Sequence, residues 1–282
     1  MTPNLASTVE TKVRRYLNKS PYHLGCVNRQ SPLPRSVSVN SATWYPWLSA
    51  GGHPGRPGYC GVPQPKVRAA ALNVLNSLPA TGSSSSTLRQ VDRKLLHQLA
   101  SAAHQSGKPC DLVSLWVATR MWGSGTSNGR GPLNTARGLT SKSLLPVLEG
   151  TASALWNGFT GANITNAYGL FVLPGSREAF FTKWFWALAL DDPNPQLRPL
   201  ILDLRVRQTV RKLLNGVQGW TPPRGRAGYI RYLQLMDAAT QNLAASFSHL
   251  DSEKLEWLFY DRPPRSMRYH QGSTEPCLYD WL

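Results

Sequence analysis

The sequence lacks any apolar run long enough to cross a membrane, which takes about 18 consecutive apolar residues. It also lacks an export signal, because residues 1–17 contain charged side chains and no apolar centre of the kind such signals have. These two absences exclude an obvious membrane or secreted class. We therefore expect a cytoplasmic protein that does not bind membranes.

Cysteine is scarce and scattered along the chain. The four cysteines form no C-x-x-C pair and have no histidine at ligand spacing; they are Cys26, Cys60, Cys110 and Cys277. Zinc sites and iron–sulfur clusters need closely spaced ligands, so we expect no metal and no other cofactor. Isolated thiols are also typical of a reducing compartment.

Acidic residues are few, since 15 Asp and Glu stand against 31 Lys and Arg and give a formal net charge of +16. Net charge indicates the kind of partner and says little about fold. The basic residues are spread along the chain and alternate with Trp, Tyr and Phe. This pattern favours nucleic acid as the partner, although a solvated basic surface without a ligand would have the same composition.

The apolar periodicity predicts about ten helices and little strand, which is a mostly α fold. Residues 87–106 are expected to form one of these helices, with a capping box at its start. Residues 19–65 are rich in Pro, Gly and aromatic side chains and are expected to form a small sheet or an arm pinned to the body. We divide the chain into an N-terminal helix and arm, 1–65, and a helical domain, 66–282.

The most informative stretch runs from residue 163 to residue 214. A first helix is expected to stop at the Leu-Pro-Gly sequence 173–175, because proline cannot continue a helix and glycine tolerates a left-handed backbone. A second helix, 176–190, is apolar on almost every face, as expected at the centre of a domain. The apolar segment that follows leads to Asp203 and then to a basic helix.

This order of helix, Leu-Pro-Gly hairpin, helix and downstream aspartate resembles the helix-hairpin-helix DNA glycosylase superfamily. The nearest resemblance is to its bacterial branch with an 8-oxoguanine-glycosylase-type fold, and it covers about residues 110–260. It implies a two-lobed helical fold. In that superfamily the hairpin reads Leu-Pro-Gly-hydrophobic-Gly, and its backbone N–H groups hold a phosphate. Here Ser176 and Arg177 replace the second glycine.

The resemblance places the catalytic aspartate of the superfamily at Asp203, within the segment 199–214. Cleavage of a glycosidic bond passes through an oxocarbenium-like sugar, and a nearby carboxylate can stabilise that charge or activate water. The residues alone allow a second interpretation, in which Asp203 only caps the helix that follows. The two roles are compatible, because a cap fixes the position of the carboxylate.

Lys183 is the lysine nearest to the position at which bifunctional members carry a nucleophile. That position falls near Ala179 or Phe180, three or four residues before Lys183. A lysine nucleophile would form a Schiff base with the sugar and allow strand nicking. The misalignment favours a monofunctional enzyme that leaves an abasic site, with Lys183 reaching from an apolar helix to a phosphate or to solvent.

DNA contacts are predicted at the hairpin, at the arginines beside Asp203 and in a Gly-rich loop after residue 122. Helix N-termini favour anions, and glycines let the backbone approach a phosphate. The loop residues Asn128 and Arg130 would fill the gap left by a flipped base. An ordinary hairpin, a solvated basic face and a flexible loop are the alternatives. The predicted DNA-binding residues are Pro174, Gly175, Ser176, Arg177, Arg205, Arg207, Asn128, Gly129 and Arg130.

A flipped base needs an aromatic or apolar slot with a few polar groups. The candidates for this slot are Trp122, Phe180, Trp184, Tyr229, Tyr232 and Asp237. Aromatic side chains at these spacings are more often part of a hydrophobic core.

Taken together, the sequence predicts a monomeric DNA glycosylase that flips a modified base out of double-stranded DNA and excises it. The base would be an oxidised base, as the resemblance implies, or a hypermodified phage base such as a modified cytosine. The first would mean DNA repair and the second antiviral defence. A non-catalytic DNA-binding protein that keeps the hairpin and an RNA-binding structural protein are the competing classes.

Overall fold

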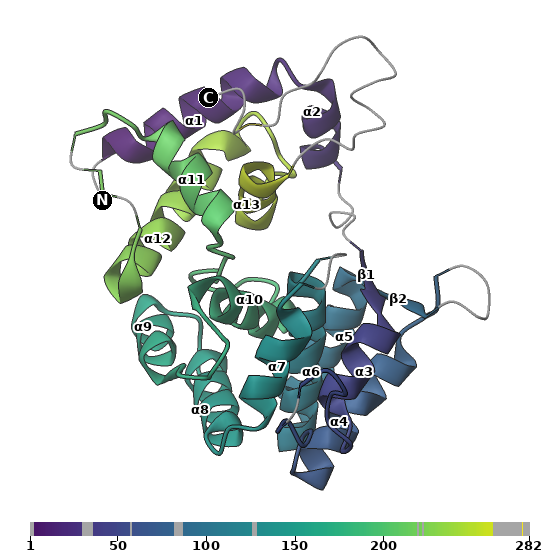
Figure 1. The fold of residues 1–282 in the computed structure, drawn as a ribbon. Coiled ribbons are helices and arrows are strands. Elements are labelled where there is room, and N and C mark those ends of the chain that lie inside the picture. Colours follow the sequence, from purple (N-terminus) through teal and green to yellow (C-terminus); the bar gives the residue numbers. More distant parts are fainter. Residues whose placement is uncertain are drawn as a thin grey trace. The chain divides into compact units, whose positions relative to one another are not determined.

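The computed structural model describes residues 3–29, 36–56, 58–81, 87–125, 129–218, 220–221, 223–261 and 278. Helices dominate the described residues (Figure 1), and the two strands found among them pair into one small sheet. The fold is therefore mostly α, as predicted. No helix within the described ranges is both long and apolar enough to cross a membrane.

The chain divides into two compact units. One unit combines Met1–Leu33 with Leu197–Leu282, and the other consists of Pro34–Gln196. The division into residues 1–65 and 66–282, expected from composition, stays a prediction.

The unit Pro34–Gln196 is built around α6 (Pro109–Gly123), which contacts α4, α5, α7, α8 and α10. The sheet lies in the same unit, and its antiparallel register places Val37 opposite Val91. The other elements are β1 (Val37–Asn40), α3 (Ser41–Leu48), α4 (Pro65–Ser77), β2 (Leu88–Val91), α5 (Arg93–Ser106), α7 (Gly131–Leu139), α8 (Leu144–Trp156), α9 (Gly161–Leu170), α10 (Glu178–Leu188) and the 3-10 helix η1 (Ala189–Asp191).

The expectation of one helix over residues 87–106 is wrong, because β2 occupies its first turn and α5 begins only at Arg93. The Asp92 side chain accepts a hydrogen bond of 2.8 Å from the Leu95 N–H and so caps α5. Strand pairing with β1 satisfies part of the backbone groups of residues 88–91, and the Gln90 N–H donates to the Pro79 carbonyl on the other side at 2.9 Å. These long-range partners are not visible in local sequence.

Helices α6 and α10 form the core of this unit because both are apolar on almost every face. Every residue from Leu115 to Trp122 is buried, and so is every residue from Phe181 to Leu188. The rings of Trp122 and Trp186 stack with their centroids 4.9 Å apart. The helix predicted over 176–190 is therefore confirmed as a central buried helix, with shorter ends.

The second unit is a cluster of helices drawn from the two ends of the chain (Figure 1). Helix α1 contacts α11 and α12, and α13 contacts the same two helices. The buried Lys254 side chain donates to the carbonyls of Arg29 and His249, at 2.6 and 2.5 Å. The helices are α1 (Pro3–Leu17), α2 (Pro21–Val27), α11 (Leu204–Leu213), α12 (Gly225–Ala244) and α13 (Ser252–Tyr260).

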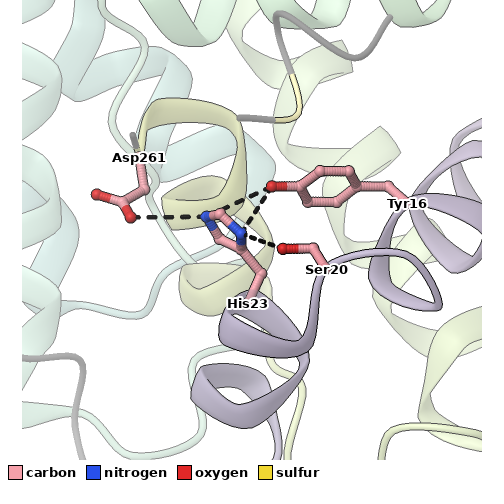
Figure 2. A network of polar contacts seen from close by, with 4 residues as sticks. All are labelled: Tyr16, Ser20, His23 and Asp261. Carbon is pink, nitrogen blue, oxygen red and sulfur yellow. Dashed lines mark hydrogen bonds and ion pairs between the residues drawn. The ribbon is translucent and has the colours of Figure 1, made fainter. Parts of the chain in front are cut away.

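His23 on α2 is the centre of a buried polar network in this unit (Figure 2). Its Nδ1 lies 2.7 Å from the hydroxyl of Tyr16 and 2.7 Å from that of Ser20. Its Nε2 lies 3.7 Å from the carboxylate of Asp261, which follows α13. Buried polar groups are costly without partners, so these contacts stabilise the junction of α1, α2 and α13.

Candidate functional site

A tight turn connects α9 to α10 at the Leu-Pro-Gly sequence. The Ser176 N–H donates to the Leu173 carbonyl at 3.1 Å and closes the turn around Pro174 and Gly175. Gly175 has a φ of 74°, which glycine adopts without steric cost. A Cβ at this position would lie 2.5 Å from the backbone oxygen of Asn134, so α7 leaves no room for a side chain.

The turn presents its far side to solvent. Pro174 and Arg177 are exposed, and Ser176 is half-buried. Arg177 occupies the N-cap position of α10, and its side chain makes no capping hydrogen bond. The first turn of α10 therefore lacks a side-chain cap, and the partial positive charge of its N-terminus favours an anion. Glu178 in the same turn supplies one negative charge from the chain itself.

Arg120 lies directly behind the turn, on the buried helix α6. Its Nη2 donates to the Gly175 carbonyl at 3.0 Å, and its Nε donates to the Thr135 hydroxyl at 3.2 Å. Its guanidinium lies over the Phe180 ring, 3.7 Å from the centroid. Sequence reasoning missed Arg120, although a single charged residue in the apolar run 112–122 is a signal that could have identified it.

Asp203 begins α11 in the other unit. Its Oδ1 accepts hydrogen bonds from the N–H groups of Arg205 and Val206, both at 3.0 Å. The capping role considered from the sequence is therefore present. These two bonds fix the orientation of a half-buried carboxylate at the start of a helix.

Two tyrosines of α12 hold the segment that leads to Asp203. The Tyr229 hydroxyl donates to the Leu200 carbonyl at 2.7 Å, and the Tyr232 hydroxyl donates to the Ile201 carbonyl at 3.1 Å. Both side chains are fully buried. Burial first, and then the charges of neighbours that include Asp203, raises the pKa of Tyr232 well above its ordinary value, so its hydroxyl remains a donor.

The start of α11 also carries a cation and an exposed apolar side chain. The Arg205 guanidinium lies over the Tyr260 ring at 5.4 Å, and its buried Nε and Nη2 have no hydrogen-bond partner among the described residues. Leu204 is 69% exposed, and Arg207 is half-buried. The helix start therefore offers donors and an apolar contact beside Asp203.

The chain matches a family model over residues 31–260, and the family is described as "Putative 8-oxoguanine DNA glycosylase OGG-like protein". The chain belongs to this DNA glycosylase family. The match includes both the Leu-Pro-Gly turn and Asp203, so the predicted resemblance to this type of glycosylase is confirmed. Membership implies DNA as the partner. No curated protein and no solved structure matches the chain.

In this glycosylase family member Lys183 is a buried residue of α10. The residue is 5% exposed, and its Nζ donates to the Ala179 carbonyl at 3.2 Å. A Cβ at Gly123 would lie 2.7 Å from Lys183 Cδ, so α6 covers the lysine stem. A nucleophilic lysine must reach the sugar, and that role for Lys183 stays a prediction.

Most of the aromatic residues predicted to line a base slot are in the cores of the two units. Trp122 and Trp184 are buried, and Trp184 Nε1 donates to the Thr151 hydroxyl at 2.9 Å. Phe180 is half-buried beneath Arg120. Contact with a base would require the buried rings to move, and their role in the slot stays a prediction.

The remaining predicted residues lie at the margins of these features. Gly129 and Arg130 are exposed just before α7, whereas Asn128 lies outside the described residues. Asp237 on α12 is half-buried; burial raises the pKa of its carboxyl, which accepts a hydrogen bond of 3.0 Å from Gln241. Within the part of the chain that the structure describes, no group of His, Cys, Asp or Glu side chains is arranged to hold a metal ion.

Proposed function

We propose that this protein is a DNA glycosylase that hydrolyses the N-glycosidic bond of a modified base, with Asp203 as its catalytic carboxylate. The observation that carries the proposal is the way Asp203 is held, in a chain that belongs to a DNA glycosylase family. Two N–H groups orient Oδ1, and two buried tyrosines fix the backbone that leads to it.

The chemistry follows from a fixed negative charge beside an electron-poor sugar. As the base leaves, positive charge develops on the sugar ring, and a carboxylate already held in place stabilises it without reorganisation. A water molecule then adds to the sugar, the Asp203 carboxylate orients it or accepts its proton, and that proton ends on the departing base. The products are the free base and an abasic site, and the reaction needs no cofactor.

The proposed DNA grip has two parts. The turn 174–177 binds a DNA phosphate. The uncapped N–H groups at the start of α10 and the exposed Arg177 donate the hydrogen bonds, which the phosphate charge strengthens. Arg205 and Arg207, at the start of α11, take the backbone beside the flipped nucleotide. This role is supported by the two buried nitrogens of Arg205 that have no hydrogen-bond partner among the described residues.

Hydrolysis by water is favoured over lysine catalysis by the surroundings of Lys183. Its ammonium is engaged with the Ala179 carbonyl of its own helix. A monofunctional enzyme leaves the strand intact until alkali cleaves it at the abasic site. Strand cleavage by the purified protein without alkali would instead assign Lys183 the nucleophile role.

The substrate is an oxidised base or a hypermodified phage base. The family description names 8-oxoguanine, which favours the oxidised base. A duplex panel separates the possibilities: plain DNA, 8-oxoguanine, alkylated bases, hydroxymethylcytosine and glucosylated cytosine, each read with and without alkali. Release of modified cytosine alone would point to antiviral defence, and release of 8-oxoguanine alone to repair.

The decisive variant is Asp203→Asn, because asparagine keeps a capping oxygen but removes the charge. We expect base release to fall by at least about 100-fold while binding to the same duplex is unchanged. Single-turnover release and fluorescence anisotropy measure the two quantities.

Asp251→Asn is the matched control for this variant. Asp251 caps α13 in the same unit through a hydrogen bond of 2.7 Å from the Lys254 N–H. The Asp251→Asn variant loses the same charge from a helix cap, so its rate of base release should equal that of the wild type. If Asp203→Asn released base at the wild-type rate, Asp203 would be only a cap. If the wild type released no base but bound DNA tightly, the chain would be a non-catalytic binding protein.

A further inference from the structure

Arg120 is a cation in the core of its unit. The residue is 1% exposed, on a helix whose neighbouring side chains are apolar. Burial lowers the pKa of Arg120 from its ordinary value to about 9, so the guanidinium is still charged at neutral pH. A buried arginine of this kind needs an explanation, because a charge without compensation in the interior is costly.

Neutral groups provide all the contacts that Arg120 makes. Its hydrogen bonds run to the Gly175 carbonyl and the Thr135 hydroxyl, and its Nη1 lies 3.5 Å from the Ser176 hydroxyl. The Phe180 ring face offsets part of the charge. Among the described residues, no carboxylate lies within ion-pair distance of Arg120.

Other positive features surround the same turn. The start of α10 carries the positive end of the helix dipole, and Arg177 beside it is exposed. Arg120 adds a fixed charge from behind, and its bonds to Gly175 and Ser176 tie that charge to the turn itself. One acidic group lies beside these positive features: Glu178, in the first turn of α10, accepts a hydrogen bond of 2.6 Å from the Tyr168 hydroxyl. Arg120 and Arg177 together outnumber this carboxylate, so the turn keeps an excess of positive charge that favours an anion.

We propose that Arg120 is the positioning residue of the Leu-Pro-Gly turn and the fixed charge that lets this turn bind a DNA phosphate. The inference rests on the proposed function only in taking the turn as the DNA grip.

The test measures binding of a plain, unmodified duplex by fluorescence anisotropy at several salt concentrations. Arg120→Met removes the charge and keeps an unbranched apolar stem. We expect about tenfold weaker binding, with the slope of log Kd against log salt reduced by about one. Arg120→Lys should recover the slope and most of the affinity. Arg56→Met, which removes an exposed arginine of the same unit, should change neither.

A merely structural arginine gives a different pattern. In that case Arg120→Lys would bind as weakly as Arg120→Met, both would melt at lower temperature, and the salt slope would not change; this result overturns the proposal. Wild-type affinity in Arg120→Met overturns it as well. If Arg120→Met does not fold, Arg120→Gln, which retains a donor for the Gly175 carbonyl, replaces it.

Failure of the inference and failure of the proposed function are separable. Base release by the wild type, together with normal DNA binding by Arg120→Met, contradicts the proposed role of Arg120 and supports the proposed glycosylase function. If the wild type releases no base from any duplex while Arg120→Met loses the affinity and the salt slope, the role of Arg120 stands and the catalytic function fails.

Discussion

The Asp203 segment and the Leu-Pro-Gly turn are held in place by opposite means. Neutral tyrosine hydroxyls fix the backbone before Asp203, and helix N–H groups hold its carboxylate. A buried guanidinium holds the turn and adds positive charge to it. The difference fits the two tasks that we propose: a catalytic carboxylate needs a fixed position with its charge preserved, whereas a phosphate-binding turn gains from every positive charge.

The largest loss of stability is expected from a substitution at Gly175 in the turn. Gly175→Ala forces a side chain into a positive φ and against the Asn134 backbone, so we expect a loss of about 3 kcal/mol in the free energy of unfolding. Urea titration measures this loss, and DNA affinity should fall with it because the turn and α7 must separate.

Gly107→Ala is the control for that substitution. Gly107 also has a positive φ, 60°, but an added Cβ would meet nothing within 4 Å. It should therefore lose only the cost of the backbone conformation, about 1 kcal/mol, with normal DNA binding. Equal losses for the two variants would show that packing of the turn against α7 contributes nothing.

A substitution at Tyr232 should disturb the segment before Asp203 with a smaller loss of stability. Tyr232→Phe removes the donor to the buried Ile201 carbonyl and should reduce the free energy of unfolding by about 1–2 kcal/mol. Base release should slow several-fold while DNA affinity is unchanged, because this change affects the position of Asp203 and leaves the turn intact. Single-turnover kinetics and anisotropy separate the two effects.

Tyr16→Phe tests whether that slowing is specific. The Tyr16 hydroxyl is also buried and bonded, to His23 in the network of Figure 2. We expect a comparable loss of stability with no change in the rate of base release. If Tyr16→Phe slowed release as much as Tyr232→Phe, general destabilisation and not the anchoring of Asp203 would be the cause.

The smallest expected effect concerns Arg205. Arg205→Gln should weaken plain-duplex binding only a few-fold and lower the salt slope by about one, with a stability change below about 0.5 kcal/mol. Arg231→Gln, at an exposed position on α12, is the matched control. An unchanged slope in Arg205→Gln would remove this arginine from the DNA grip and leave the turn as the main source of positive charge.

Local sequence determined several parts of this protein. Proline and glycine at 174–175 dictate where α9 and α10 are separated, because one cannot continue a helix and the other takes the positive φ. The unbroken apolar composition of α10 dictates its burial. Asp203 before a basic helix predicted both a cap and a candidate acid, and the cap is present.

Tertiary structure alone decided the rest. Residues 88–91 became a strand because a partner strand far away in the sequence pairs with them, against the local helical signal. Local sequence does not show that Tyr229 and Tyr232 bind the carbonyls of Leu200 and Ile201. The contact between Arg120 and the Gly175 carbonyl depends on the packing of α6 behind the turn, because hydrogen bonds and buried charges depend on neighbours that local sequence does not specify.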